Sequence, residues 1–260
     1  MKERIYQSFI ELTNGKYSSL MLKKLVTSSF SKRFIRGYSK VYEIELSEIS
    51  QDLHSFTSLQ QFFTRQLKQG ARPFEYNHQV FISPVDGKIE SFGNIEQDAI
   101  FTVKGKPYTL YDLLGNDNRV NDYKNGKFIV FYLSPADYHR VHCPQEGEVV
   151  RQYTLGNKSY PVNKIGLTYG KKPITHNYRM INEVKCQNNK HYSLIKVGAM
   201  YVNSITLTNS STFWDIGEEV GYFGFGSTVV MLFEEEFVNF TENIRQGQIV
   251  KMGEPIATML

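Results

Sequence analysis

A serine that directly follows a glycine is the first candidate for chemistry in this chain. Gly226 and Ser227 stand between a run rich in glycine and aromatic residues and an apolar run that begins at Thr228. Glycine adopts backbone conformations that are closed to other residues, and it leaves its carbonyl open to attack. The hydroxyl of a serine held at such a bend could attack the preceding peptide bond and cut the chain. A tight turn before a strand is the alternative, and this motif alone favours it.

Two histidines three residues apart are the second candidate. His139 and His142 lie in the polar segment 132–144, directly after an apolar run that predicts a strand over 128–133. The point where a strand ends and a loop begins is a usual place for functional residues. In a short turn or helix this spacing puts both imidazoles on one side, where one can act as base and the other as acid. Zinc ligation is a weak alternative, because no third ligand stands at a familiar spacing. Ordinary hydrogen-bonded histidines are another.

Asp86 is the third candidate, in a segment where Pro84 precedes it and Gly87 follows it. An ordinary Asp-Gly turn is the simpler interpretation. The functional interpretation is a carboxylate that orients a histidine. Asp86, His142 and Ser227 would then form a triad by role. The aspartate sets the imidazole tautomer, the histidine takes the proton, and the serine attacks.

The elements that must position these residues are mainly strands. Short β-rich runs alternate with Gly, Asn, Asp and Pro breaks, which predicts one β-dominated domain over residues 61–260. A short helix near 109–114, ended by Gly115, interrupts the strands. The strands are predicted at 79–82, 127–133, 147–153, 192–207 and 228–233.

The closing segment 244–256 has two glycines six residues apart around a short apolar run. This texture is similar to the turns of lipoyl- and biotinyl-carrier hammerheads, but the segment lacks the lysine of a carrier tip. We therefore expect shared strand geometry rather than a prosthetic-group site. The predicted fold class is α+β: a β-dominated domain with lipoyl-hammerhead-like strand texture, preceded by N-terminal amphipathic helices.

Residues 1–60 are predicted to form a basic helical region. The first forty residues carry nine Lys or Arg and two Glu, although the whole chain has a net charge of only +4. A helix over 19–36 would align Leu22, Val26, Phe30 and Phe34, with basic residues elsewhere. Such a helix can lie on an anionic bilayer. Packing on its own domain, with a solvated basic face, is an equal alternative. Nucleic-acid binding is less favoured, because no recognition module follows.

A second helix is predicted over 57–68, capped by Thr57 or Ser58 and stopped by Gly70 and Pro73. At 260 residues the chain could form one large domain or two small ones. Its two cysteines, Cys143 and Cys186, are expected to be free thiols in a reducing compartment. No apolar run reaches the length of a membrane span, and no signal-peptide pattern opens the chain.

Several ordered motifs together resemble the phosphatidylserine decarboxylase proenzyme family, from about residue 60 to the end of the chain. The most specific is Tyr138-His139-Arg140-Val141-His142, followed by Pro144. Three positions depart from the family pattern: Asn203, Phe225 and Cys143, none of them in the suggested triad. The other matching segments are 62–73, 84–87, 177–179, 197–199 and 226–228.

The resemblance implies a specific reaction. Ser227 attacks the carbonyl of Gly226 to give an ester. Elimination and hydrolysis then release chains 1–226 and 227–260, the second beginning with a pyruvoyl group made from Ser227. Asp86, His142 and Ser227 match the self-processing triad, and His139 matches the histidine of decarboxylation. The amine of phosphatidylserine forms a Schiff base on this covalent pyruvoyl cofactor. Carbon dioxide leaves, and phosphatidylethanolamine is the product.

The resemblance also implies partners and a location. We expect a heterodimer of the two cleaved chains, paired into a homodimer, with no metal and no nucleic acid. Residues 1–60 would dock on an anionic phospholipid membrane, at the cytoplasmic side of the cell membrane, without spanning it. Three alternatives stay open. They are a related enzyme acting on another serine-bearing lipid, a non-catalytic carrier or binding domain, and a histidine-ligated metalloenzyme.

Overall fold

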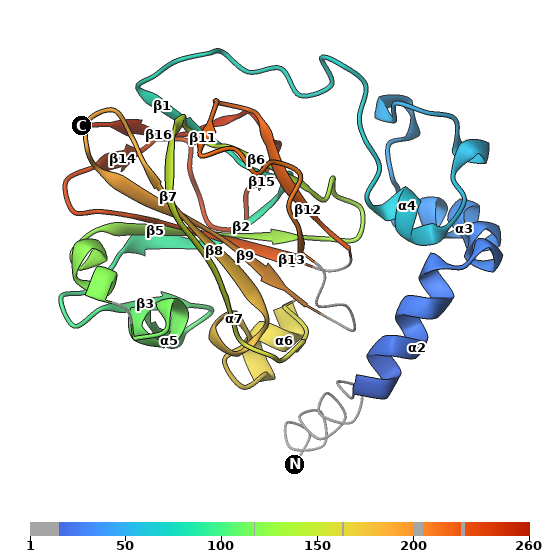
Figure 1. The fold of residues 1–260 in the computed structure, drawn as a ribbon, viewed down its shortest axis with the longest axis horizontal. Coiled ribbons are helices and arrows are strands. Elements are labelled where there is room, and N and C mark those ends of the chain that lie inside the picture. Colours follow the sequence, from blue (N-terminus) through green and yellow to red (C-terminus); the bar gives the residue numbers. More distant parts are fainter. Residues whose placement is uncertain (1–15, 117, 163, 200–204, 225–226) are drawn as a thin grey trace.

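A large antiparallel sheet lies at the centre of the computed structural model (Figure 1), which describes residues 16–116, 118–162, 164–199, 205–224 and 227–260. Within these ranges the sheet has eight strands: β2 (Gly87–Asn94), β5 (Lys127–Leu133), β7 (Gly147–Leu155), β8 (Arg179–Lys185), β9 (His191–Gly198), β11 (Phe213–Trp214), β13 (Ser227–Phe233) and β15 (Ile249–Val250). Their order across the sheet is β11-β7-β8-β9-β13-β5-β2-β15. Strand β13 is therefore central, with β9 and β5 as its neighbours.

Smaller sheets accompany the large one. One joins β1 (Val80–Ile82), β16 (Pro255–Met259) and β14 (Val238–Phe240). A second joins β10 (Ile205–Thr206), β12 (Glu219–Phe223) and β6 (Arg140–His142). A hairpin pairs β3 (Ile100–Val103) with β4 (Lys106–Thr109). The described residues thus confirm the predicted β-dominated α+β class.

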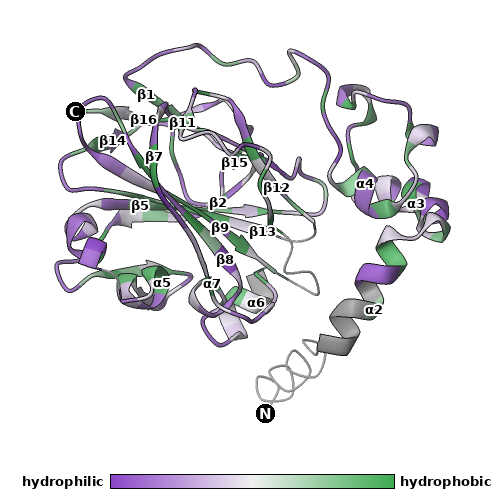
Figure 2. Cartoon of the chain, viewed as in Figure 1, coloured by the Kyte–Doolittle hydropathy of each residue, from purple (hydrophilic) through white to green (hydrophobic). Residues whose placement is uncertain are grey.

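Alternating residues of the central strands separate two hydrophobic cores, because successive side chains of a strand point to opposite faces of the sheet. On β13, Val229 and Met231 belong to the first core, whereas Val230 and Leu232 belong to the second. The first core also takes residues from both three-stranded sheets. The second takes residues from α5 (Leu110–Leu114), η4 (Asn118–Tyr123), α6 (Lys164–Tyr169) and α7 (Pro173–His176). Figure 2 shows hydrophobic residues concentrated along the central strands.

Several predicted elements are confirmed. Strand β5 has the predicted bounds 127–133, and β1, β7 and β13 match their predictions to within two residues. Helix α5 is capped at its N-terminus by Thr109, whose hydroxyl accepts a hydrogen bond from the Asp112 N–H, and at its C-terminus by Gly115 with φ = 83°. The continuous strand predicted over 192–207 is wrong. Strand β9 ends at Gly198, and β10 belongs to another sheet.

The single helix predicted over 19–36 is also wrong. The structure has α2 (Lys16–Thr27), the 3-10 helix η1 (Ser29–Phe34) and α3 (Ile35–Val41). Ser28 between α2 and η1 is extended, with ψ = 152°. The hydroxyls of Thr27 and Ser28 donate to the carbonyls of Lys23 and Leu25. Ser and Thr side chains compete in this way with the helical backbone, which explains the break.

The helix predicted over 57–68 is shorter than expected. Helix α4 (Leu59–Phe63) is capped by Ser58, as predicted, but it stops before Thr64. The following residues pair with an earlier segment instead, which contains the 3-10 helix η2 (Leu46–Glu48). The Ser50 N–H donates to the carbonyl of Gln66, and Ile49 forms an isolated bridge with Leu67. This long-range pairing competes with continuation of the helix.

The N-terminal helices, with the 3-10 helix η3 (Leu53–Ser55), have a small core of their own. It consists of Ile35, Ile44, Ile49, Phe56 and Phe62. The residues of the predicted apolar helix face do not share one environment. Val26 is buried, whereas Phe30 and Phe34 are about half exposed. Over the described residues, no helix combines the length and apolar character that a membrane span requires.

Candidate active site

The ends of three neighbouring strands bring the candidate residues to one end of the large sheet. Ser227 is the first residue of β13, and it pairs with Leu133 at the end of β5 and Gly198 at the end of β9. Asp86 directly precedes β2, which pairs with β5 at this same end. Gly226, the other half of the predicted cleavage site, lies outside the described residues.

Ser227 has an unusual environment for a serine. Its side chain is fully buried, and its Oγ has no hydrogen-bond partner in the part of the chain that the structure describes. An unsatisfied buried hydroxyl costs about 1–3 kcal/mol of stability. Such a group in a native structure therefore requires an explanation, and a catalytic role is one of the recognised ones.

His139 is a neutral imidazole with one nitrogen unused. Its Nδ1 donates a hydrogen bond to the carbonyl of Asp137 at 2.8 Å, which leaves the lone pair on Nε2. That Nε2 is buried and unpaired within the described residues. The ring packs against Phe63, with 3.9 Å between ring centroids. Complete burial, reinforced by the charge of Arg65, lowers the pKa of His139 to about 3. The ring is therefore uncharged at neutral pH, with an accepting lone pair on Nε2.

His142 is neutral as well, but both of its nitrogens have partners. Nδ1 donates to the carbonyl of Gly217 at 2.8 Å, and the Tyr138 hydroxyl donates to Nε2 at 3.1 Å. Burial lowers the pKa of His142, while the Gly217 hydrogen bond acts in the opposite direction. The segment forms strand β6 rather than the turn or helix that would align the two rings. The two imidazoles consequently have separate surroundings.

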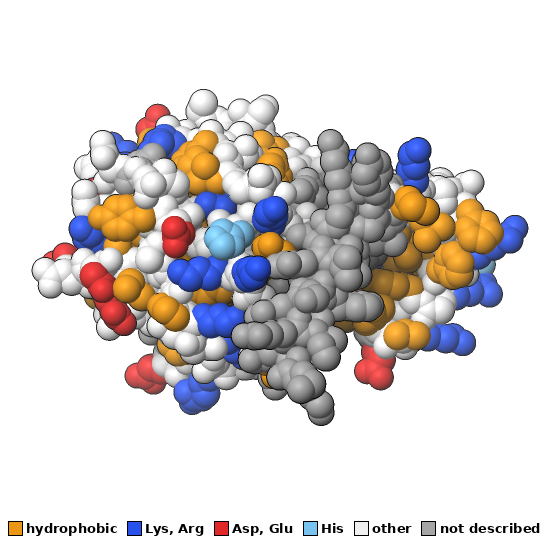
Figure 3. All heavy atoms as spheres, turned by 90° about the horizontal axis from the view of Figure 1, so that it is seen from below, with side chains coloured by type: hydrophobic (Ala, Val, Ile, Leu, Met, Phe, Trp, Pro, Cys, Tyr) orange, Lys and Arg blue, Asp and Glu red, His pale blue; other side chains and the backbone are white. Residues whose placement is uncertain are grey.

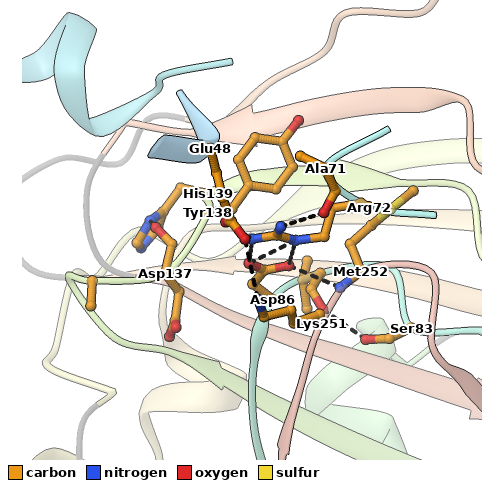
Figure 4. A network of polar contacts seen from close by, with 12 residues as sticks. Glu48, Ala71, Arg72, Ser83, Asp86, Asp137, Tyr138, His139, Lys251 and Met252 are labelled. Atoms are coloured by element: carbon orange, nitrogen blue, oxygen red, sulfur yellow. Dashed lines mark hydrogen bonds and ion pairs between the residues drawn. The ribbon is translucent and has the colours of Figure 1, made fainter. Parts of the chain in front are cut away.

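Asp86 is the centre of an ion-pair network (Figure 4). Its carboxylate accepts hydrogen bonds from Arg72, with Nε 2.8 Å from Oδ1, and from the Met252 N–H at 2.9 Å. Arg72 Nη2 also lies 2.8 Å from Glu48 Oε2. Glu48 in turn lies 3.2 Å from Lys251 Nζ. The guanidinium of Arg72 thus joins the N-terminal helical region to the aspartate of the predicted triad.

The three predicted triad residues lie in one region of the molecule, but the hydrogen bonds of a catalytic triad are not formed between them. Besides the shared sheet end, the His142 N–H donates to the carbonyl of Pro84, two residues before Asp86. Among the described residues, however, the Asp86 carboxylate is bonded to Arg72 and Met252, and the His142 ring is bonded to Tyr138 and Gly217. The Asp86, His142 and Ser227 side chains therefore share one region but are not hydrogen-bonded to one another.

Segment 62–73 supports the site, a role that our interpretation of the sequence did not assign. Arg65 is buried, and its Nη2 donates to the carbonyls of Ala136 at 2.6 Å and Asp137 at 3.0 Å. Arg140 donates back to the carbonyl of Thr64. Together with Phe63 against His139 and Arg72 against Asp86, these contacts hold the histidine segment and the aspartate in position. Arg65 and Arg72, which both lie in the segment that resembles the family motif, were the sequence signal that could have indicated this supporting role.

Lys196 is a second residue that sequence reasoning missed. It is fully buried on β9, its Nζ donates to Asn182 Oδ1 at 2.7 Å, and it lies over the Trp214 ring. Its partner across the ladder is Val229, so it faces the same side of the sheet as Ser227. Burial lowers the pKa of Lys196 to about 7. A lysine within a strand pattern carries no local signal of such burial.

This lysine should give the chain a distinctive pH dependence of stability. The folded pKa of about 7 lies below the ordinary value of 10.5, so the unfolded chain binds more protons between these values. The free energy of unfolding should therefore rise with pH in that window, by about 1.4 kcal/mol per pH unit from this group. Below pH 7 the contribution of Lys196 should be constant, because the lysine is protonated in both states. Lys196→Met should remove that component of the rise and stabilise the chain near neutral pH. Urea unfolding of both proteins at pH 7 and pH 9 measures it, and identical pH slopes would contradict it.

The other described residues that the sequence singled out are buried and have no evident part in the chemistry. Asn177 is buried and bonds the carbonyls of Tyr160 and Gly198. Cys143 and Cys186 are buried free thiols, and burial raises the pKa of Cys143 to about 12. No group of three or more His, Cys, Asp or Glu suited to a metal ion occurs among the described residues. Asn203 and Phe225 lie outside them.

A buried serine hydroxyl with no partner among the described residues lies at the same end of the sheet as Asp86, an arrangement typical of an enzyme whose site is built around a serine. Comparisons with known proteins agree. The model of the family described as phosphatidylserine decarboxylase matches residues 59–258. Phosphatidylserine decarboxylase proenzymes of Bacillus thuringiensis (strain Al Hakam) and Bacillus cereus (strain 03BB102) are each 43% identical to this chain over 260 residues. The match covers 100% of this chain and 99% of each relative.

The chain belongs to the phosphatidylserine decarboxylase family. The predicted resemblance is confirmed, and so is the predicted enzyme class, a decarboxylase. The alternative of a non-catalytic carrier or binding domain is not supported.

Proposed function

We propose that this chain is a self-processing, pyruvoyl-dependent decarboxylase that converts phosphatidylserine to phosphatidylethanolamine. The observation that carries the proposal is the Ser227 hydroxyl, which is buried at the first position of a central strand and has no partner among the described residues. A serine that must become a pyruvoyl group needs a hydroxyl free to react, so this residue fits the group. Membership of the family, and relatives named as proenzymes, support both parts of the proposal.

In the proposed self-cleavage, Ser227 Oγ attacks the carbonyl carbon of Gly226, and the peptide bond is replaced by an ester. His142 is the base that takes the serine proton, which requires that its Nε2 exchange the Tyr138 hydroxyl for the serine. Asp86 stabilises the protonated imidazole, since its charge raises the pKa of His142 against the larger effect of burial. Elimination breaks the ester, and hydrolysis of the resulting dehydroalanine releases ammonia and leaves the pyruvoyl group.

In the proposed decarboxylation, the pyruvoyl group supplies a ketone that acts as an electron sink while the substrate carboxylate leaves as carbon dioxide. His139 handles the proton. Its Nε2 is neutral and bonds to no group in the described part of the chain, and the Nδ1–Asp137 hydrogen bond holds the tautomer in which Nε2 carries the lone pair. Phe63 covers the ring and excludes water from it.

The proposed assembly has two regions and two cleaved chains. Residues 1–60 form the docking region and residues 61–260 the catalytic domain. The exposed aromatic rings of Phe30 and Phe34, beside Arg33 and Arg36, support docking on an anionic bilayer. Chains 1–226 and 227–260 would stay together as a heterodimer, because β13 is hydrogen-bonded along its whole length to β5 and β9. A homodimer of that unit, peripheral on the cytoplasmic side of the cell membrane, completes the proposal.

Intact mass spectrometry combined with a decarboxylation assay tests the function. The purified chain should separate into species 1–226 and 227–260, and the shorter one should react with a carbonyl reagent. His139→Gln should still be cleaved but should release carbon dioxide from phosphatidylserine about 10²–10⁴-fold more slowly, the usual contribution of a positioned acid–base group. A folded, membrane-supplied sample that stays uncut would overturn the proposal. A His139→Gln variant with full activity would overturn only the role of His139.

A further inference from the structure

A basic pocket lies on the opposite side of the large sheet from Ser227. It has a volume of about 570 Å³ and lies between the segment after β7 and helix α7. Lys158, Lys171, His176 and Arg179 contribute its basic side chains, and no Asp or Glu is among the described residues that line it. Leu155 and Tyr160 add apolar surface. This composition suits an anion attached to a less polar body.

Arg179 gives the pocket a positive charge that is held in place by the fold. The side chain is 3% exposed. Its guanidinium donates to backbone carbonyls, those of Leu113 at 2.8 Å, Asp112 at 2.6 Å and Thr175 among them. None of its hydrogen bonds goes to a carboxylate within the described chain. Burial lowers the pKa of Arg179 to about 10, so the group stays charged at neutral pH and favours a bound anion.

The pocket is separate from the reacting serine. Arg179 pairs with Val197, whose side chain belongs to the second hydrophobic core. Ser227 has the strand parity of Val229 and Met231, which belong to the first core. Side chains on the two faces of a sheet point away from each other, so an anion bound near Arg179 would lie on the opposite face of the sheet from Ser227.

Helix α7, which carries part of the pocket lining, and helix α2 both lie toward the lower side of the molecule in Figure 1, the side that Figure 3 shows. Seen from below, several Lys and Arg side chains and one acidic side chain lie around a histidine on the β-rich body, and hydrophobic and basic side chains of the N-terminal segment lie to the right. The exposed aromatic residues of that segment include Phe30 and Phe34. A bilayer lying against this side would therefore meet both helix α2 and the segment that carries the basic pocket.

We propose that this pocket binds the phosphate of an anionic phospholipid headgroup and docks the β-rich body onto the bilayer. It provides a second membrane contact in addition to the N-terminal helices. The inference rests on the proposed function in requiring a membrane, but it assigns the pocket to a docking lipid rather than to the lipid that is decarboxylated. A lipid headgroup and free inorganic phosphate would be recognised by the same chemistry. We commit to the lipid headgroup, because the pocket and helix α2 lie toward the same side of the molecule.

Vesicle flotation of the full chain tests the docking site. The double variant Lys158→Gln, Lys171→Gln should bind vesicles of phosphatidylcholine and phosphatidylglycerol about 25-fold more weakly than the unchanged chain, since each lysine near an anionic surface contributes about fivefold. The matched control, Lys68→Gln with Lys185→Gln, removes the same charge at positions outside the pocket lining. It should weaken binding less than threefold. Equal loss in both pairs, or no loss in either, would overturn the proposal.

A second arm separates a phosphate site from diffuse charge. At equal ionic strength, inorganic phosphate should displace the unchanged chain from these vesicles more strongly than chloride does, and this difference should shrink in the Lys158, Lys171 double variant. Equal displacement by the two salts would overturn the proposal. Self-cleavage and decarboxylation of detergent-dispersed phosphatidylserine, measured on the same samples, test the proposed function separately. Inactive but vesicle-binding protein would contradict that function and leave the docking site intact.

Discussion

Ser227→Ala is expected to leave one uncut chain of 30.1 kDa that lacks the carbonyl group and has no decarboxylase activity. Alanine cannot supply the hydroxyl that attacks Gly226, and no later step can replace it. The fold should survive, because the substitution removes a buried hydroxyl that bonds to no described residue and leaves the β13 backbone pairing in place. Intact mass, carbonyl labelling and circular dichroism of the purified variant measure the three outcomes.

The neighbouring residue offers a matched control for this prediction. Thr228 is also buried, and its hydroxyl is likewise unpaired within the described chain. It lies on the other face of β13, so Thr228→Val removes a similar hydroxyl without touching the proposed nucleophile. We expect normal cleavage and a stability equal to or slightly above that of the unchanged chain. Cleavage of Ser227→Ala at the same bond would show that another residue is the nucleophile.

Arg72→Met is expected to produce the largest loss of stability. Arg72 is 10% exposed, and it pairs with the 8% exposed side chain of Asp86 and with Glu48. Removal of one partner leaves the other charge buried without compensation, which typically costs about 3–5 kcal/mol. Asp86 would also lose the contact that orients it, so self-cleavage should slow. Urea unfolding and the time course of the uncut fraction after synthesis measure the two effects.

The outer end of the same network is the control for Arg72. Lys251 also pairs with Glu48, but 54% of its side chain is exposed. Exposed ion pairs contribute at most about 1 kcal/mol, so Lys251→Met should change stability by less than that and leave cleavage unchanged. If Arg72→Met and Lys251→Met were equally mild, the network would be a surface feature with no role in holding Asp86.

The predicted fold was most accurate where local sequence and burial agree. Strand β5 has its predicted bounds because Phe128–Leu133 is almost wholly apolar and mostly buried, which suits a central strand. Helix α5 was predictable because Thr109 caps it and Gly115 ends it. The helices at 19–36 and 57–68 were predicted too long. Hydroxyl-to-backbone bonds at Ser28 end the first, and pairing of Gln66 with Ser50 ends the second.

The sequence by itself determined the chemical groups: a Gly-Ser pair, two histidines and an aspartate whose order and spacing identify a decarboxylase family. Only the tertiary structure decided their state. The partners of Asp86, the packing of Phe63 against His139 and the burial of Lys196 all arise from contacts between segments far apart in the chain. The basic pocket around Arg179 arises in the same way. A residue's pKa and free hydrogen-bonding capacity depend on which distant groups remove water from it, and local spacing does not contain that information.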